Sequence, residues 1–447
     1  MSVSKLFQVV IVFTGAAVSI LVFPPVFDPI NTVKLLTLLF GSWIGWILFI
    51  SINKPSYTKL VDKLAIILAV SFIGLALISF LVNGQSFQNA ALGAWGRNNG
   101  LYSYIALISL FLFLSHFGNI YSAKLIINSL TLIAFIFSIY AWLQYYKIDI
   151  LHNIYPWYNY DLTLALTLGN SNFASVFLAF LFTASIGYVL DSSNKNYLRF
   201  ITLLPISLLI GLVQLLDSQG QIIFALGFLL VVGFWLTFNQ NLNLKRLKYV
   251  WWPGSILIGI LGILGLNGVG IFGERLSDAF INLKDRFYHW QTAVNMMKDH
   301  LFFGVGIDNF GQWQRRYRSL ESIEYRGTPM SGTDNAHNVF LQFGATAGLP
   351  LLIVYSLIIL LIFWRSIVAL RVNSEKALVG SLFSVWLCYQ VQSLVSIDQI
   401  GLSIWNWIIG GALVGLSRHS QPTKDLPSET KNNHLNSVQL RKRLKIF

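Results

Sequence analysis

The chain has 447 residues, of which 55% are hydrophobic and only 11% are charged, and its mean hydropathy is +0.63. This composition excludes a soluble globular protein and is typical of a polytopic membrane protein. The formal net charge of +13 does not require a nucleic-acid partner, because much of the basic excess lies in a polar tail at residues 418–447, which can meet anionic lipid headgroups.

Twelve apolar runs are long enough to cross a bilayer, which takes about 20 residues per helix. The first nine are expected at residues 6–23, 32–52, 64–83, 101–116, 122–145, 171–190, 198–216, 220–238 and 249–271. The last three are expected at residues 337–363, 376–396 and 399–417. The first run could instead be a signal peptide, since Lys5 precedes it. It continues to Pro24 and Pro25 without a small-residue cleavage site, so we expect a retained span.

Lys and Arg residues gather in alternate loops, which the positive-inside rule assigns to the cytoplasm. These loops carry Lys54, Lys59 and Lys63; Lys124; Lys195 and Arg199; Lys245, Arg246 and Lys248; and Arg365, Arg371 and Lys376. The twelve-span count puts them on one side with Lys5 and the tail. Segments 84–100, 146–170 and 217–220 then lie outside, together with one large periplasmic loop at residues 272–336 between the ninth and tenth spans.

Metal and disulfide chemistry find little support. Cys388 is the only cysteine and lies in a predicted span, which excludes an intramolecular disulfide and a cysteine-ligated metal site. The outer segments contain no Asp-x-Asp pair, no His-x-x-x-His pair and no acidic cluster. We therefore expect neither a metal ion nor another cofactor.

The large loop contains eight basic and eight acidic residues, so an anion site there must come from local arrangement. Apolar residues at three- and four-residue steps predict a helix over residues 286–301 with one apolar stripe. The stripe consists of Phe287, Trp290, Val294, Met297 and Leu301. Arg286 and His289 flank it. This helix could simply lie in the membrane interface, with Trp290 as an anchor and Arg286 extending toward the headgroups.

His337 stands where the loop ends and the tenth span begins. Thr333, Asp334 and Asn335 are typical N-cap residues, so we expect His337 in the first turn of that span. The positive end of the helix dipole would leave its ring neutral and able to accept a proton. The histidine could also be merely tolerated in polar surroundings, and a role as general base requires a phosphate-binding arginine beside it.

Three motifs follow one another across this region. They are Arg286-Phe-Tyr-His-Trp290, the run from Asp299 through Gly304-Val-Gly306 to Asn309-Phe310, and His337-Asn338-Val-Phe-Leu-Gln342 followed by Gly344 and Gly348. In this order they resemble the core of the O-antigen ligase and polymerase superfamily, over about residues 200–355. The resemblance implies an all-α, glycosyltransferase-C-like membrane protein. Its ligase-like core spans residues 200–355, between transmembrane helices at 1–199 and 356–417 and a basic cytoplasmic tail at 418–447.

Two outlying segments are similar to further family features, and one departs from the family. The segment Trp-Gly-Arg97-Asn-Asn-Gly is similar to a family Gly-Arg-x-x-Gly sequence, although Arg97 could instead contact a lipid headgroup. Asn170 and Asn172 resemble the family's Asn-x-Asn opening of a span, although they could simply cap a helix. Where many members have Ser-Arg-Gly, this chain has Gln219 before Gly220. Losing that charge removes roughly 1 to 3 kcal/mol of phosphate binding.

The resemblance implies a glycosyltransferase of the bacterial inner membrane with its active site on the periplasmic face. Such enzymes move a glycan from undecaprenyl pyrophosphate to an acceptor hydroxyl without a metal ion. We expect Arg286 to bind the pyrophosphate and His337 to deprotonate the acceptor. The other expected substrate contacts are Arg97, Gln219, Asn338, His289, Trp290, Arg315, Arg316, Arg318, Asn170 and Asn172.

Alternatives stay open at this point. A ligase would use the lipid A core as acceptor, a polymerase another lipid-linked repeat, and a protein-glycosylating ligase is a further variant. Arg316 is followed by ten residues and then Gly327, a spacing similar to a motif of polymerase loops that chance could also produce. The placement of Arg286 and His337 around one large loop favours the ligase. A transporter of small anions is less favoured, because the centres of the predicted spans are almost devoid of charge.

Overall fold

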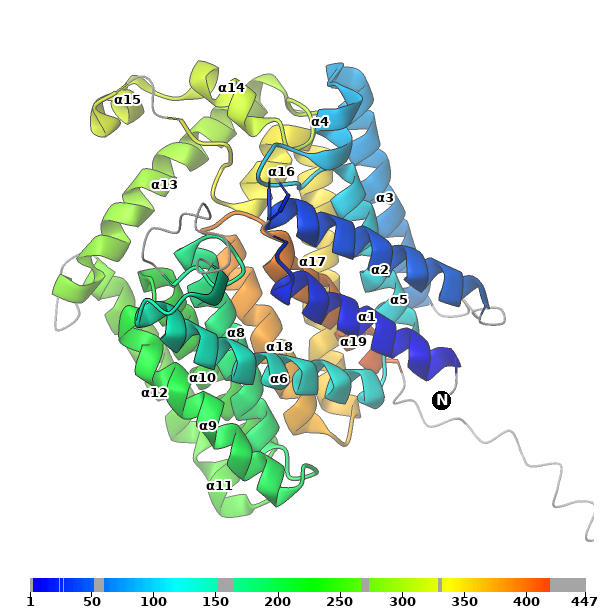
Figure 1. The fold of residues 1–447 in the computed structure, drawn as a ribbon, viewed down its shortest axis with the longest axis vertical. Helices are drawn as coiled ribbons and strands as arrows, with labels where there is room; N and C mark the ends of the chain where they lie inside the picture. Colours follow the sequence, from blue (N-terminus) through cyan, green and yellow to red (C-terminus); the bar gives the residue numbers. More distant parts are fainter. Residues whose placement is uncertain are drawn as a thin grey trace, which may run out of the picture.

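The computed structural model of the protein describes residues 3–23, 25–26, 28–51, 60–151, 164–266, 273–328 and 332–418. In these ranges every regular element is a helix. Eight of the helices are long and apolar enough to cross a membrane. The chain is therefore an all-α polytopic membrane protein, as its composition predicts (Figure 1).

In chain order, the first six helices are α1 (Val3–Ile20), α2 (Asn31–Ser51), α3 (Leu60–Asn83), α4 (Phe87–Leu92), α5 (Leu101–Phe117) and α6 (Ile120–Tyr145). The middle of the chain forms α8 (Ser171–Leu190), α9 (Asn196–Leu212) with the 3-10 turn η1 (Val213–Leu215), α10 (Ser218–Phe238), α11 (Leu242–Arg246) and α12 (Lys248–Leu266). The last part forms α13 (Gly273–Asp299), α14 (Phe310–Tyr317), α15 (Leu320–Arg326), α16 (Val339–Ala347), α17 (Leu349–Val372), α18 (Lys376–Ser393) and α19 (Ile400–Leu416).

Each of the twelve predicted spans overlaps a helix, but not all of these helices are equally suited to cross a bilayer. The eight candidate spans lie in α1, α2, α3, α6, α8, α9 with η1, α10 and α17. The helices α5 and α19 are apolar but shorter. Residues 267–271 of the ninth predicted span lie outside the described residues. The total of twelve spans remains a prediction.

The tenth predicted span, at residues 337–363, is wrong in its position. The short helix α16 ends at Gly348, and the candidate span α17 runs from Leu349 to Val372. Gly348 has φ +89°, and a Cβ added there would lie 2.2 Å from the carbonyl oxygen of Phe302. The apolar run is thus broken by a backbone approach that only glycine permits. Arg365 and Arg371, expected in the following loop, lie within α17 instead.

The core of the bundle is built around α19, whose residues are buried from Ile400 to Leu416. It packs against α5, α1, α18 and α17. Lys34 at the start of α2 is fully buried, and its Nζ donates to the carbonyls of Val18 (2.7 Å) and Ser19 (3.1 Å) at the end of α1. The last carbonyls of a helix lack intrahelical partners, so a buried ammonium satisfies them and offsets the negative end of the dipole.

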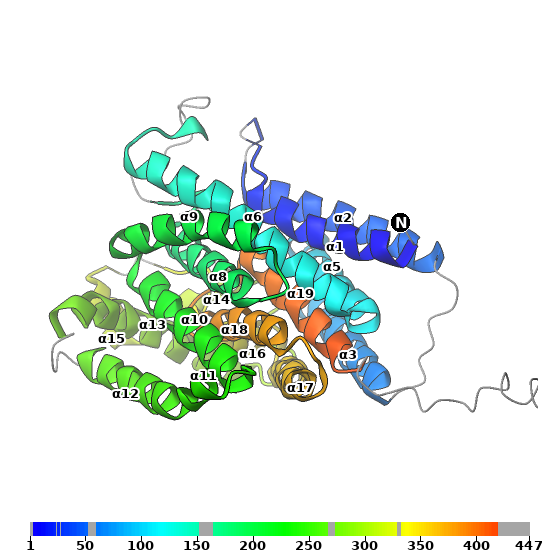
Figure 2. The ribbon, with the colours of Figure 1, turned by 90° about the horizontal axis from the view of Figure 1, so that it is seen from below.

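The polar segment predicted as a large loop is mostly helical and lies at one end of the bundle. In Figure 1, α14 and α15 lie at the top of the molecule and α13 descends from them along the left flank, with α16 beneath α14 and α4 to its right. The view from below in Figure 2 places α1 and α2 side by side on one flank and α12 and α13 on the other. The helix α13 packs against α12, α16 and α14. This packing brings the three family-like motifs together.

Candidate functional site

The helix predicted over residues 286–301 is present as the second half of α13. Three residues of the predicted apolar stripe, Phe287, Val294 and Leu301, are exposed, as they would be in a helix whose apolar face meets the membrane interface. The residues that face the protein include His289 and Met296, which are buried. The inner face of α13 thus combines the polar His289 with the apolar Ala293 and Met296, so the periodicity of apolar residues alone does not identify it.

Trp290 links α13 to the segment before α16. Its Nε1 donates a hydrogen bond of 3.3 Å to the backbone carbonyl of His337. The indole therefore holds the backbone that carries His337, in addition to any contact with a membrane interface. The expected order of a tryptophan helix followed by a His-Asn pair thus corresponds to a direct contact across 47 residues.

His337 does not lie in the first turn of a helix, so that prediction is wrong. It has φ +50°, and Asn338 is the N-cap of α16, with its side-chain oxygen accepting from the amide of Leu341 (3.0 Å). The Asn338 amide nitrogen donates to the carbonyl of Leu394 (2.8 Å). The Asn335 side chain accepts from the backbone amide of His337 (3.0 Å). Two asparagine side chains thus fix the left-handed turn, where side chains with a Cβ are uncommon.

The ring of His337 stacks on the ring of His289, with centroids 5.0 Å apart and an angle of 19° between the planes. The pKa of His337 is lowered from 6.5 to about 3, first by burial and then by the neighbouring His289, Arg286 and Arg97, while Asp334 opposes this shift. The ring is therefore neutral at physiological pH. The cause is burial and nearby positive charge, in place of the helix dipole expected from the sequence.

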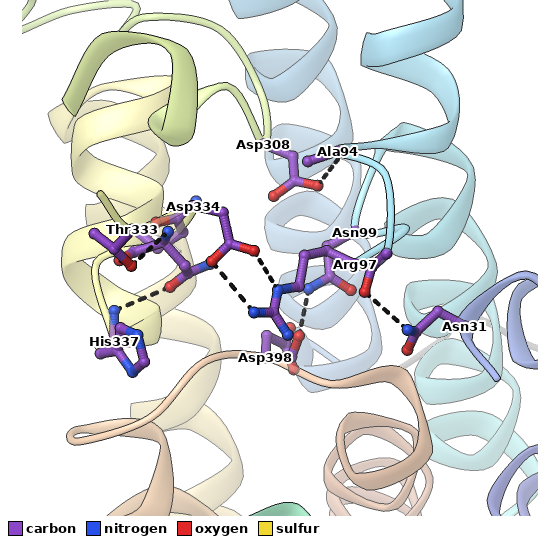
Figure 3. A network of polar contacts seen from close by, with 12 residues as sticks. Asn31, Ala94, Arg97, Asn99, Asp308, Thr333, Asp334, His337 and Asp398 are labelled. Carbon is purple, nitrogen blue, oxygen red and sulfur yellow. Dashed lines mark hydrogen bonds and ion pairs between the residues drawn. The ribbon is translucent and has the colours of Figure 1, made fainter. Parts of the chain in front are cut away.

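Arg97, between α4 and α5, reaches the same segment. Its Nε lies 2.6 Å and its Nη2 3.3 Å from the two carboxylate oxygens of Asp334. Figure 3 shows Asp334 between Arg97 and His337. Such a two-pronged contact fixes orientation as well as distance. Arg97 is therefore held at the candidate site by a carboxylate.

The loop that carries Arg97 is fixed from below as well. Asn99 donates to the backbone carbonyl of Asp398, between α18 and α19 (Figure 3). The Asp398 carboxylate accepts from the hydroxyls of Tyr389 (2.7 Å) and Tyr104 (3.3 Å). The position of Arg97 is thus set by helices that are far from it in the sequence.

Asp308 anchors the other side of this loop. Its buried carboxylate accepts a hydrogen bond of 2.7 Å from the backbone amide of Ala94 (Figure 3). Gly93 has φ +90°, and a Cβ added there would lie 2.6 Å from both an Asp308 oxygen and the Asn99 nitrogen. Burial raises the pKa of Asp308 to about 7, although the amide donors oppose this rise.

The Gly-x-Gly turn after α13 packs directly against the end of α16. The amides of Val305 and Gly306 donate to the carbonyls of Ala345 (3.0 Å) and Thr346 (2.8 Å). Gly304 has φ +60°, and a Cβ added there would lie 2.3 Å from the carbonyl carbon of Thr346. The motif therefore brings two backbones together and so fixes α16, and the residues before it, relative to α13.

Arg286 lies on α13 one turn before Trp290 and is half-buried. Burial lowers its pKa to about 10, against the opposing effects of the carboxylates of Asp285 and Asp217. It remains a cation at neutral pH and is near enough to His337 to lower the pKa of that ring. The structure thus brings Arg286, His337 and Arg97 together.

Gln219 lies in the first turn of α10, directly after the Asp217 and Ser218 that begin it. It is buried, and its Nε2 donates to the carbonyl of Val395 (3.2 Å). Asn338 donates to the preceding carbonyl of Leu394 (2.8 Å). Both side chains therefore hold the turn after α18 in place.

The interactions defined for the remaining predicted contact residues involve partners other than His337. Asn170 is the N-cap of α8 and accepts from the amide of Asn172 (2.8 Å). Asn170 therefore caps this helix, and a substrate contact of the two residues stays a prediction. Arg315 and Arg316 are exposed on α14, and the Arg316 guanidinium lies over the rings of Trp313 (5.8 Å) and Tyr317 (5.9 Å). Arg318 ends α14.

Sequence reasoning missed two members of the site. Arg326, the last residue of α15, places Nη2 at 2.7 Å from an oxygen of Asp285 and 2.7 Å from Nε2 of His289. The four-residue spacing of Asp285 and His289 on one helix face could have indicated a pair. No local pattern points to Arg326, because it comes from a different helix. Within the described ranges, no group of three or more His, Cys, Asp or Glu side chains could hold a metal ion.

These observations define a class of protein: a polytopic membrane protein with a neutral histidine and two arginines clustered at one end of its helix bundle. A family model described as O-antigen ligase matches residues 204–356, which include α13 to α16 and all but the first four residues of the predicted core. Over about a third of its length the chain is therefore similar to the O-antigen ligase family, which supports a place in the O-antigen ligase superfamily. The family suggests an O-antigen ligase-like membrane glycosyltransferase. A comparison with curated proteins found no match.

Proposed function

We propose that the protein moves a glycan from undecaprenyl pyrophosphate to an acceptor hydroxyl at the periplasmic face of the bacterial inner membrane. The observation that carries this proposal is the neutral ring of His337 next to Arg286, with Arg97 held beside it by Asp334. A cation for a leaving phosphate and a neutral base for an incoming hydroxyl are the two groups that such a transfer requires.

Arg286 is the residue we assign to the pyrophosphate. Its half-buried guanidinium keeps its charge, and the carboxylates that act on it are Asp285 and Asp217. A planar guanidinium offers paired donors that match phosphate oxygens. In partly dry surroundings these donors would stabilise the charge that develops as the pyrophosphate leaves.

His337 is the residue we assign to the acceptor. The acceptor oxygen bonds to the anomeric carbon of the donor sugar, the bond from that carbon to the phosphate oxygen breaks, and the pyrophosphate keeps the electron pair. The hydroxyl proton passes to the ring nitrogen of His337, which afterwards returns it to water. Atoms and charge balance without a metal ion or redox partner.

The low pKa of His337, about 3, makes the ring a weak base before donor binding. Positive charge on Arg286 and Arg97 contributes to this value. A pyrophosphate bound at Arg286 would offset that charge and raise the pKa of His337. His337 would thus become a stronger base once the donor is bound. Before donor binding, its low pKa would keep the ring unprotonated and the enzyme active.

Arg97, Asn338 and Trp290 would assist at this centre. Arg97 would reach the donor if a phosphate replaced the Asp334 carboxylate. Trp290 binds the backbone carbonyl of His337, and Asn338 ties the next residue to the carbonyl of Leu394. We propose the lipid A core as the acceptor, since one compact region carries both reacting groups. A polymerase would use the same centre with a second lipid-linked repeat as acceptor.

The test is transfer by the purified protein from an undecaprenyl-pyrophosphate glycan to the lipid A core. Arg286→Ala and His337→Ala should each lower the rate by at least about 100-fold, in the range typical of acid–base and electrostatic groups. Lys298→Ala, an exposed cation on the same helix, is the matched control and should retain the rate. Full activity of both site variants would refute the assignment. Single additions favour a ligase, and growing chains favour a polymerase.

A further inference from the structure

A row of contacts leads from α15 to His337 and is not used by the proposed reaction. It runs from Asp285 and Arg326 to His289 and then to His337. Arg326 contributes from the last turn of α15, whereas Asp285 and His289 lie four residues apart on α13. Arg326 contacts His289, and His289 in turn stacks on the candidate base His337.

The hydrogen bonds of Arg326 define the protonation state of His289. Nη2 of Arg326 lies 2.7 Å from Oδ1 of Asp285 and 2.7 Å from Nε2 of His289, which accounts for both of its hydrogens. A guanidinium can only donate, so Nε2 of His289 must accept. Assigned from this hydrogen-bond network, the His289 ring is the neutral tautomer with its proton on Nδ1.

The state of His289 matters because its ring is buried against that of His337. Only 5% of His289 is exposed, and the two centroids are 5.0 Å apart with planes at 19°. A proton on His289 would place a positive charge beside the ring that has to accept the acceptor proton. Two such stacked rings cannot readily both be cations.

We propose that Arg326 is a positioning residue: by donating to His289 it keeps that ring neutral, so that His289 supports the ring of His337 without competing for the proton. This inference rests on the proposed function of His337 as the base. It gives α15 a role in the reaction although none of its residues contacts His337 in the structure described.

The charged groups around the two rings are consistent with this role. His337 faces Arg286 and His289 from α13, Arg97 from the loop before α5, and Asp334 from its own segment. Asp285 Oδ2 lies 3.4 Å from Nε2 of His289, and Asp285 Oδ1 accepts from Arg326 (2.7 Å). Without Arg326, this carboxylate would therefore stabilise a protonated His289.

Direct binding of a substrate phosphate is the competing role for Arg326. The two hydrogens of Nη2 would then have to leave Asp285 and His289. The two roles differ in their consequences. A phosphate contact changes the apparent affinity for the donor at every pH, whereas control of His289 changes the pH at which the enzyme becomes active.

The experiment compares Arg326→Met, His289→Phe and the double variant in glycan transfer from the lipid-linked donor. Met keeps an extended side chain but cannot donate, and Phe keeps a flat ring that cannot ionise. We expect Arg326→Met to move the acidic limb of kcat/KM upward by about one pH unit or more, a tenfold change in proton affinity. In the His289→Phe background the same change at Arg326 should leave the limb unmoved. An equal loss at every pH, or a shift that persists without His289, would overturn the proposal.

A second measurement does not depend on transfer. The chain has seven histidines, and nitrogen NMR of the detergent-solubilised protein with labelled histidine separates neutral from protonated rings. The signal lost in His289→Phe identifies this residue. We expect it to stay neutral through mildly acidic pH in the wild type and to take up a proton there in Arg326→Met. A protonated His289 in the wild type at neutral pH would overturn the inference. If His289 behaves as expected in both proteins but no glycan is transferred, only the proposed function is refuted.

Discussion

Replacement of Asp308 by Asn should make the protein more stable at high pH and not at low pH. Asp308 is a buried carboxyl group that accepts from the amide of Ala94 and holds the loop that carries Arg97. Asn has nearly the same size and keeps an oxygen that can accept this hydrogen bond. The substitution therefore removes the ionisation and leaves the packing in place.

The sign and size follow from the pKa of Asp308, which burial raises from 3.8 to about 7. In the unfolded chain the carboxyl group loses its proton at about pH 4, whereas in the folded protein it keeps it until about pH 7. Its contribution to stability is therefore fully present below about pH 4 and is lost as the pH rises through about 7. A shift of about three units bounds the loss at roughly 4 kcal/mol, since one unit corresponds to about 1.4 kcal/mol.

The assay is thermal unfolding of the wild type and Asp308→Asn in the same detergent at pH 5 and pH 8.5. The variant should unfold a few degrees above the wild type at pH 8.5 and should show a smaller gain, or none, at pH 5. Glu321→Gln, which neutralises an exposed carboxylate on α15, should give the same difference at both pH values. If the difference between Asp308→Asn and the wild type is also independent of pH, the reasoning about the buried carboxyl group is refuted.

Three further predictions concern the site. Arg97→Ala and Asp334→Asn should each slow glycan transfer several-fold, because their pair is only partly buried and contributes about 1 kcal/mol; losses that multiply in the double variant would contradict their coupling. Gly304→Ala should lower the unfolding midpoint far more than Gly327→Ala, since a Cβ at Gly304 meets backbone at 2.3 Å whereas none lies within 4 Å at Gly327; similar midpoints would show that the turn can move. With the pKa of His337 at about 3, wild-type kcat/KM should lack a histidine limb between about pH 5 and 8, and an inflection near 6.5 would contradict this.

Composition and apolar runs identified the chain as a helical membrane protein, and its motifs singled out candidate residues for the site. Long apolar runs must become helices in a bilayer, because only a helix satisfies its own backbone there. The motifs around Arg286, Gly304 and His337 also indicated where the site lies. Their order along the chain corresponds to contacts, since Trp290 bonds to the backbone of His337 and the glycine turn packs against α16.

The tertiary structure decided which face of α13 turns inward, where the tenth span begins, and how His337 is held. It alone revealed the pairing of Arg97 with Asp334, which are 237 residues apart, and of Arg326 with His289, which are 37 apart. Helical periodicity and capping depend on neighbours within a few residues, so they can be predicted from the sequence. A contact between distant side chains depends on how whole helices pack, and no local sequence pattern predicts that packing.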